Sequence, residues 1–359
     1  MDKRIPLNGL PLKEYHLQTR KAIKPVHVDH VGTAYTVDKD NFAALADVTV
    51  YSLELWEACM RLPHWHPNAA ELGYVISGSI EIIIWRSPGE TAVFTLGPGM
   101  CWFIPKAALH SLNNVGSGQA QLLVGFSVER PQDIDLPVAF NGIPIPIRDT
   151  YTAAHAALRQ WQGNTENPLI GRCPVLPALQ EITTGSPYGF DLAKVTPLFK
   201  DENLGSVTWG IQCNWRILEE ISMLRAHLKP GVARDPIWYP DAGTLYVVSR
   251  GNGEFTIIIA TGETPTPFKV ILGDYVYVPT GVLHTFCNTS ASEDFEVIAF
   301  FTQANPQPEV SLAVATGFFP NTVRKAAMTQ YGAENKVGDP LKELRLNKVS
   351  PYLLRIKRE

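Results

Sequence analysis

The sequence has little of what marks several common classes of protein. Its five cysteines are widely scattered and none belongs to a CxxC pair, which argues against a zinc ribbon or a disulfide framework. The net charge is only -4, so there is no electrostatic basis for binding nucleic acid or an anionic membrane. No stretch approaches the roughly 20 apolar residues of a membrane helix, and residues 1–16 contain no apolar segment typical of a secretory signal. These absences, with cysteines that are expected to stay reduced, predict a cytoplasmic protein.

What the sequence does contain is an internal repeat. Residues 61–78, RLPHWHPNAAELGYVISG, match residues 234–251, RDPIWYPDAGTLYVVSRG, with an offset of 173 positions. A second motif, G-x5-P-x4-H-x3-N, begins at Gly99 and again at Gly273, with an offset of 174. Because two separated motifs agree in their offset to within one residue, we infer an internal duplication.

Both copies have the pattern of β structure. Runs such as ELGYVISGSIEIIIW and TLYVVSRGNGEFTIII are rich in Val, Ile and aromatic residues and are interrupted by Gly, as strands and tight turns are. Many short strands with Gly, Pro and Asn turns predict an all-β protein of antiparallel sandwiches or barrels. Residues 152–161 and 311–332 instead contain helix formers, and the Pro-rich region 131–148 is interpreted as an irregular exit from the first barrel.

These patterns predict five segments. They are an N-terminal extension at 1–45, a first barrel with a metal site at 46–145, a connector with a short helix at 146–190, a second barrel without a complete metal site at 191–305, and a C-terminal helical segment and tail at 306–359.

The first copy holds a set of metal-binding side chains. His64 and His66 are two residues apart, so on a strand both point to one face, roughly 6.5–7 Å apart at the backbone. Glu71 would face the other way on an unbroken strand, but the intervening PNAA can turn the chain and bring it inward. Barrel closure can then bring His110 close. Three imidazoles and one carboxylate suit Mn²⁺, Fe²⁺, Ni²⁺ or Zn²⁺, and an ion that prefers six ligands keeps two positions open for substrate or O2.

The two motifs, HxHx4Ex6G and Gx5PxGx2Hx3N, resemble those of the cupin superfamily, whose small barrels are of the jelly-roll type. Two copies in one chain resemble the bicupins of the oxalate decarboxylase-like and germin-like branch, over about residues 45–335. The resemblance implies two tandem cupin barrels. It also implies manganese bound by His64, His66, Glu71 and His110, and an arginine, Arg61, that binds the substrate carboxylate beside the metal.

The chain departs from the family pattern in its second copy. There Ile237, Tyr239 and Thr244 replace the first three ligands, so we predict no metal in the second barrel. His284 is expected to form a hydrogen bond with a neighbour such as Tyr239 or with buried water. Arg234 repeats Arg61 without a metal beside it, and either binds an anion or pairs with a nearby acid or carbonyl.

Two smaller departures lie in the first copy. Ala107 stands where the family motif has Gly, and a small side chain is tolerable there. The decarboxylases of the family carry, after the first barrel, a loop whose Glu donates a proton. Here the loop reads SVERPQDIDLP, in which Glu129 and Asp133 are candidate general acids. The competing interpretation, that both are solvated loop charges, agrees with the usual exposure of Asp and Glu.

We therefore predict a metal-dependent enzyme that acts on a small carboxylic acid, with oxalate decarboxylase or oxidase chemistry. The metal would either bind the acid and O2 side by side or polarise a carbonyl group as a Lewis acid. The alternatives are a metal-binding or small-molecule-binding cupin without turnover, and an Fe(II) dioxygenase or isomerase with a larger substrate. The expected partners include neither nucleic acid nor membrane. The exposed edges of such sheets favour a homo-oligomer.

Overall fold

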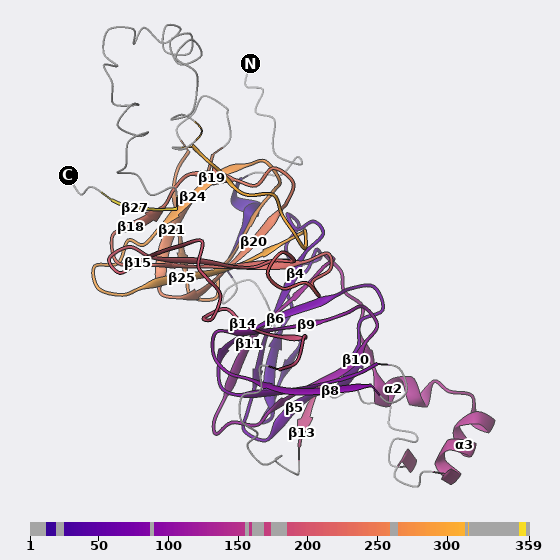
Figure 1. Cartoon of the computed structure of the whole chain (residues 1–359). Helices are drawn as coiled ribbons and strands as arrows, with labels where there is room; N and C mark the ends of the chain where they lie inside the picture. Colours follow the sequence, from indigo (N-terminus) through magenta and orange to yellow (C-terminus); the bar gives the residue numbers. More distant parts are fainter. Residues whose placement is uncertain are drawn as a thin grey trace, which may run out of the picture. The chain divides into compact units, whose positions relative to one another are not determined.

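The chain folds into two β units (Figure 1). The computed structural model describes residues 12–18, 25–86, 90–154, 158–159, 169–173, 185–258, 265–312, 315 and 352–356. The first-barrel unit comprises Ile23–Val195 and Gly210–Ser222, and the second-barrel unit comprises Met1–Ala22, Thr196–Trp209 and Met223–Glu359. The all-β prediction with two barrels is confirmed.

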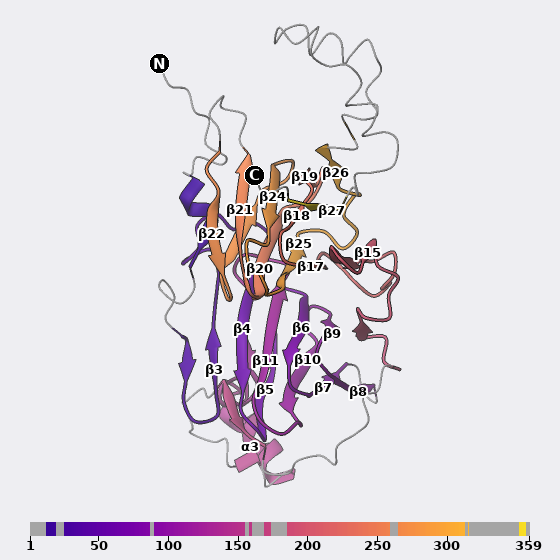
Figure 2. The ribbon, with the colours of Figure 1, turned by 90° about the vertical axis from the view of Figure 1, so that its left-hand side faces the viewer.

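The first-barrel unit is made of two sheets. The larger sheet has the strand order β14 (Gly189–Asp191), β9 (Met100–Ile104), β6 (Glu71–Ser77), β11 (Ala120–Phe126), β4 (Thr49–Leu55), β3 (Gly32–Tyr35) and β2 (His27–Val28). The smaller sheet has the order β12 (Ile134–Asp135), β5 (Cys59–Trp65), β10 (Leu109–Asn114), β7 (Ile80–Trp85) and β8 (Thr91–Leu96), and β13 (Ile170–Arg172) also pairs with β5. Figure 2 shows β3, β4, β11 and β6 side by side in one layer.

Alternating apolar residues place the core between these two sheets. Ile80, Ile82 and Ile84 of β7 point to one face and are fully buried, as the two-residue period of a strand requires. They pack in one cluster with Leu122 and Val124 of β11, from the other sheet. Polar residues are buried beside this cluster on three strands, His64 on β5, Glu71 on β6 and His110 on β10.

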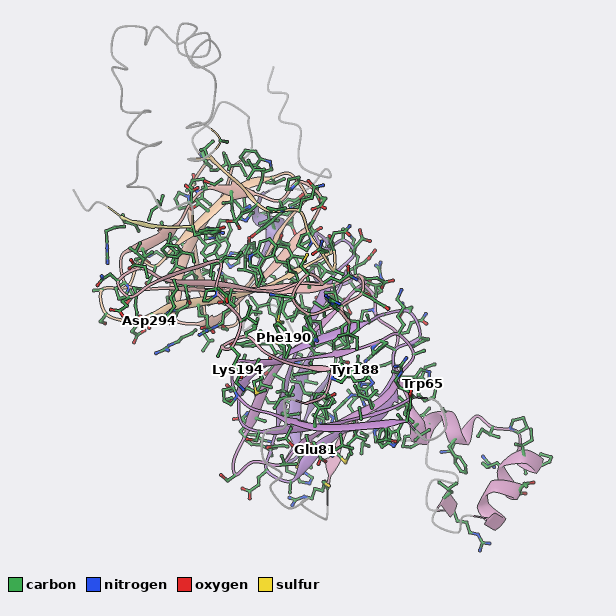
Figure 3. All side chains as sticks on the ribbon, viewed as in Figure 1. Trp65, Glu81, Tyr188, Phe190, Lys194 and Asp294 are labelled. Carbon is green, nitrogen blue, oxygen red and sulfur yellow. The ribbon has the colours of Figure 1, made fainter. Side chains whose placement is uncertain are left out.

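Two short helices follow the first barrel, α2 (Leu136–Asn141) and α3 (Ile145–Ala154), and both lie outside its sheets (Figure 1). The prediction of an irregular exit over 131–148 is therefore wrong, because this region holds β12, α2 and the start of α3. Pro137 and Pro146 lie in the first turn of their helices, where a missing N–H costs no hydrogen bond. Trp65, labelled in Figure 3, ends β5 and pairs with Ile134 just before α2.

The second-barrel unit repeats the two-sheet plan. One sheet has the order β1 (His16–Leu17), β23 (Tyr275–Val278), β20 (Thr244–Arg250), β25 (Phe295–Phe301), β17 (Ser222–Leu228), β16 (Gly205–Gly210) and β15 (Phe199–Asp201). The other has the order β22 (Phe268–Ile271), β21 (Asn252–Ile258), β24 (Leu283–Cys287), β18 (Val232–Arg234) and β27 (Leu353–Arg355), while β19 (Ile237–Trp238) pairs with β24 and with β26 (Val310–Ser311). A 3₁₀ helix, η2 (Leu12–Tyr15), precedes β1.

Several expectations concern parts of the chain that the structure does not describe. The predicted C-terminal helical cap falls almost wholly outside the described residues, as does half of the helix expected at 152–161. All five cysteines lie among the described residues, and none of them forms a disulfide bond there. Within the described ranges, no helix combines the length and the apolar character that crossing a membrane requires.

Candidate metal centre

The four predicted ligands come from neighbouring strands of the first barrel. His64 lies on β5, His66 follows directly after it, and His110 on β10 is the register partner of His64. Between β5 and β6 the turn at residues 67–70 takes the chain from the smaller sheet to the larger one. Glu71, the first residue of β6, consequently faces inward and is buried, as the PNAA turn had indicated.

These four side chains converge in the barrel interior. One ligand-type atom from each of His64, His66, Glu71 and His110 lies within 4.8 Å of all the others. The imidazole rings of His64 and His110 are 4.1 Å apart at their centroids, and His66 is 4.9 Å from His64 and 5.4 Å from His110. All four residues are buried. The structure therefore brings together the whole predicted set.

Backbone carbonyl groups orient all three histidines. Nδ1 of His64 lies 2.7 Å from the oxygen of Leu62, and Nδ1 of His110 lies 2.9 Å from that of Ala108. Nδ1 of His66 lies 3.0 Å from the oxygen of Gln132. A carbonyl oxygen can only accept, so each Nδ1 donates a proton outward, and in the neutral ring Nε2 faces the centre with its lone pair available. Such outer hydrogen bonds are the usual means of fixing a metal-binding histidine.

Glu71 is held as a carboxylate at the centre. Burial alone would raise the pKa of Glu71, but protonated imidazoles of His110 and His66, whose Nε2 atoms lie 3.2 Å and 3.1 Å from its Oε2, outweigh burial and lower it. Its other oxygen, Oε1, accepts a hydrogen bond of 2.7 Å from the indole nitrogen of Trp102. A buried carboxylate needs a positive partner.

The donor set fits a divalent transition metal. Three oriented Nε2 atoms and one carboxylate oxygen supply the mixed nitrogen and oxygen ligands that Mn²⁺, Fe²⁺, Ni²⁺ and Zn²⁺ accept. His64 suits this role because burial, followed by the nearby charge of Arg61, lowers its pKa well below the usual value and keeps the ring neutral. Neutral imidazole is the form that binds metal ions.

Arg61 and Asp133 lie beside the centre. Arg61 is buried, and its Nη1 donates to Oδ1 of Asp135 at 2.5 Å and to the carbonyl of Leu169 at 3.2 Å. Its Nη2 forms an ion pair of 3.1 Å with Oδ1 of Asp133, which also lies 3.2 Å from Nδ1 of His66. Asp133 thus contacts both the guanidinium and a histidine of the centre.

A pocket opens onto this group of side chains. It is lined by polar residues of the centre, Arg61, His64, His66, Glu71 and Asp133, and by a mostly apolar wall that includes Tyr51, Leu53, Leu112, Val124 and Phe126. The other candidate acid, Glu129, is not among the lining residues, and its carboxylate accepts the backbone N–H of Asp47 at 3.1 Å. Of the two loop acids, the structure places Asp133 at the pocket.

The equivalent place in the second barrel is filled by packed side chains. Ile237, Tyr239 and Thr244 are all buried there. His284 keeps the orientation of His110, with Nδ1 2.9 Å from the carbonyl of Val282, but its Nε2 accepts a hydrogen bond of 2.6 Å from the hydroxyl of Tyr246. The partner is thus Tyr246 and not Tyr239, and burial lowers the pKa of His284 to about 4.

One exchange of side chains explains how the two interiors differ. In the first barrel Gly73 pairs with Trp102, and a Cβ at Gly73 would lie 1.9 Å from the indole ring. In the second barrel the equivalent register pair is Tyr246 and Val276. The bulky residue has moved to the other strand. In the first copy it donates to the Glu71 carboxylate, and in the second it donates to His284. Sequence reasoning missed this role of Trp102, although the exchange is visible at the repeat offset.

The fold and the site define a duplicated β-barrel protein in which the described residues form one metal-type centre, in the first copy. The chain belongs to the cupin family, which its residues 22–158 and 217–336 match. It is a bicupin of the oxalate decarboxylase and germin branch.

Three relatives support this placement. The chain is 22% identical to an oxalate decarboxylase of Arthroderma benhamiae over 356 residues, which covers 90% of this chain and 83% of the relative. It is 34% identical to a germin-like protein (subfamily 3 member 1) of Arabidopsis thaliana over 83 residues, 23% of this chain and 40% of the relative. The structure of a deletion mutant of Bacillus subtilis oxalate decarboxylase matches with a TM-score of 0.82 at 20% identity, and covers 96% of this chain and 89% of that one.

Proposed function

We propose that this chain is a metal-dependent enzyme that decarboxylates oxalate or a closely similar small carboxylic acid. The observation that carries the proposal is the meeting of a complete His₃Glu donor set with a cation, Arg61, and an acid, Asp133, on one pocket. Relatives named oxalate decarboxylase, among them one that aligns with 90% of this chain, support the same chemistry.

The proposed ligands are His64, His66, Glu71 and His110, and the proposed ion is manganese. A bound ion supplies a positive centre that binds a carboxylate oxygen and withdraws electron density from it. The remaining steps belong to side chains of the pocket.

Arg61 is the group that binds and orients the substrate. Its guanidinium is buried and is held by Asp135 and by the carbonyl of Leu169, so it is fixed before a ligand arrives. Arg61 contacts Asp133 through one ion pair, between Nη2 and Oδ1 at 3.1 Å, and the side chain of Asp133 is 35% exposed. A substrate carboxylate can therefore replace Asp133 on Nη2, where charge-assisted hydrogen bonds hold it beside the centre.

Asp133 is the proposed proton donor. Once a substrate carboxylate has taken Nη2 of Arg61, Asp133 loses its cationic partner and faces the substrate from the pocket mouth. In the overall reaction the carbon–carbon bond of the oxalate monoanion breaks and carbon dioxide leaves. The remaining carbon takes a proton from the Asp133 carboxyl group and becomes formate. That proton is the acid proton of the substrate monoanion, which passes to the ion-paired Asp133 carboxylate when the substrate binds, so the reaction consumes no other reagent.

The proposal predicts that the purified protein converts oxalate to formate and carbon dioxide in equal amounts. Because the donor set needs its ion, chelator-treated protein is expected to lose this turnover and to regain it when manganese is added back. Formate and carbon dioxide are measured together with hydrogen peroxide. Peroxide with two carbon dioxide molecules per oxalate would indicate an oxidase, and thermal stabilisation by oxalate without any product would indicate a binding protein. Either result would contradict decarboxylation.

A further inference from the structure

Arg234 of the second barrel lies in the same backbone surroundings as Arg61 of the first. Arg61 is the register partner of Ile170 on β13, and Arg234 is the register partner of Leu353 on β27. In each case the residue before that partner accepts a hydrogen bond from Nη1. The acceptor is the carbonyl of residue 169 at 3.2 Å in the first barrel and that of residue 352 at 2.6 Å in the second. The strand partner and the carbonyl acceptor of the arginine are therefore duplicated along with the barrel.

The acidic partner of the arginine is duplicated too. Strands β12 and β26 pair in the same register with the equivalent strands β5 and β19, which makes Asp133 and Glu309 equivalent positions. Nη2 of Arg61 contacts one oxygen of Asp133, whereas Nη2 of Arg234 donates to both oxygens of Glu309.

A third contact follows the same symmetry. His66 and Tyr239 occupy matching places in the repeat, 173 positions apart. Nδ1 of His66 lies 3.2 Å from Asp133, and the hydroxyl of Tyr239 donates to Oε2 of Glu309 at 3.0 Å. A carboxylate is thus held in both barrels by an arginine and by a side chain from the same strand end.

The two carboxylates differ in how firmly they are held. The side chain of Asp133 is 35% exposed, while that of Glu309 is 6% exposed and its partner Arg234 is 1% exposed. Glutamate has one more methylene group than aspartate, so it reaches deeper and presents two oxygens to the guanidinium. A guanidinium buried to this degree needs an anion beside it, and the chain itself supplies one.

We propose that the second barrel retains a carboxylate-binding site whose ligand is the chain's own Glu309. The side chain acts as a tethered small carboxylate, and it fixes the segment that carries β26 on the barrel. Removing it opens a site for a free monocarboxylate of matching size. This inference does not depend on the activity proposed for the first barrel.

The variant Glu309→Ala tests this directly. The substitution removes a CH2–COO⁻ unit, which has the size of acetate, and leaves Arg234 buried and unpaired. We expect the melting temperature to fall by roughly 10 °C. Saturating acetate is expected to restore at least about 2–4 °C of that loss. Formate should restore less and benzoate nothing, because one is too small and the other too large for the space.

Three comparisons make the result specific. Glu309→Gln keeps the side chain in place, so acetate should leave its melting temperature unchanged. Arg234→Met/Glu309→Ala lacks the cation and should not respond either. Glu296→Ala breaks another Arg–Glu pair, whose arginine, Arg225, is 33% exposed, and should show no recovery in acetate. Sodium chloride at equal ionic strength controls for salt.

Each result of the acetate experiment either supports or overturns the proposed site. Recovery of Glu309→Ala in acetate, absent from the double variant, supports the site. A folded Glu309→Ala protein that responds equally to acetate and chloride overturns it. If the Glu309→Ala protein does not fold without acetate, its refolding yield is measured with and without acetate. A higher yield in acetate supports the site, and equal yields overturn the proposal.

Discussion

His110→Ala is expected to lose both the metal and the turnover of oxalate, whereas His284→Ala keeps both. Sites with four protein ligands bind structural zinc with roughly 10–16 kcal/mol, so one ligand is worth about 3 kcal/mol, or about 100-fold in affinity. Turnover at low metal concentration is expected to fall at least as much. Bound metal is measured by elemental analysis after dialysis, and turnover by formate release.

His284→Ala is the matched control for this variant. Both histidines lie on equivalent strands, β10 and β24, and both place Nδ1 against a backbone carbonyl. Nε2 of His110 faces the carboxylate of Glu71, whereas Nε2 of His284 accepts a hydrogen bond from Tyr246. If the two variants lost metal equally, the account of one centre in the first barrel would fail.

Asp133→Asn is expected to lower kcat by about 100- to 10,000-fold, the usual contribution of a positioned general acid. Asparagine keeps the shape of the side chain but has no acidic proton to deliver. The metal content should stay the same, because Asp133 is not one of the four converging side chains. The KM for oxalate should not rise, since the substitution removes the carboxylate that competes for Nη2 of Arg61.

Glu129→Gln separates the two acids of the loop. Its carboxylate bonds to the backbone of Asp47, and Glu129 does not line the pocket, so kcat should stay within about twofold of the parent protein. A loss of kcat in Glu129→Gln, with full activity in Asp133→Asn, would reverse the assignment of the proton donor.

The sequence alone could predict how three of the four converging side chains meet, because their spacing is local. Two histidines two residues apart share a strand face, and the turn at PNAA allows Glu71 to reverse its direction. His110 lies on a separate strand, and barrel closure was expected to bring it close. Strong β patterns in the same segments also predicted the two barrels correctly.

The contacts that support the site depend on register between distant strands, which local patterns do not encode. Trp102 reaches Glu71 only because Gly73 lies opposite it on β6. The pairing of Arg234 with Glu309 joins residues 75 positions apart through a strand of two residues, β26, which is too short to show a period. The choice of Tyr246 over Tyr239 as the partner of His284 rests on the same kind of geometry.

The central claim is that one metal centre, in the first barrel, serves the whole chain. The most direct test is the metal content of protein purified without chelator, measured by elemental mass spectrometry against protein concentration. The account predicts one transition-metal ion per chain, with manganese as the ion. Two ions per chain, or a protein that takes up neither manganese nor iron when these are supplied, would contradict it.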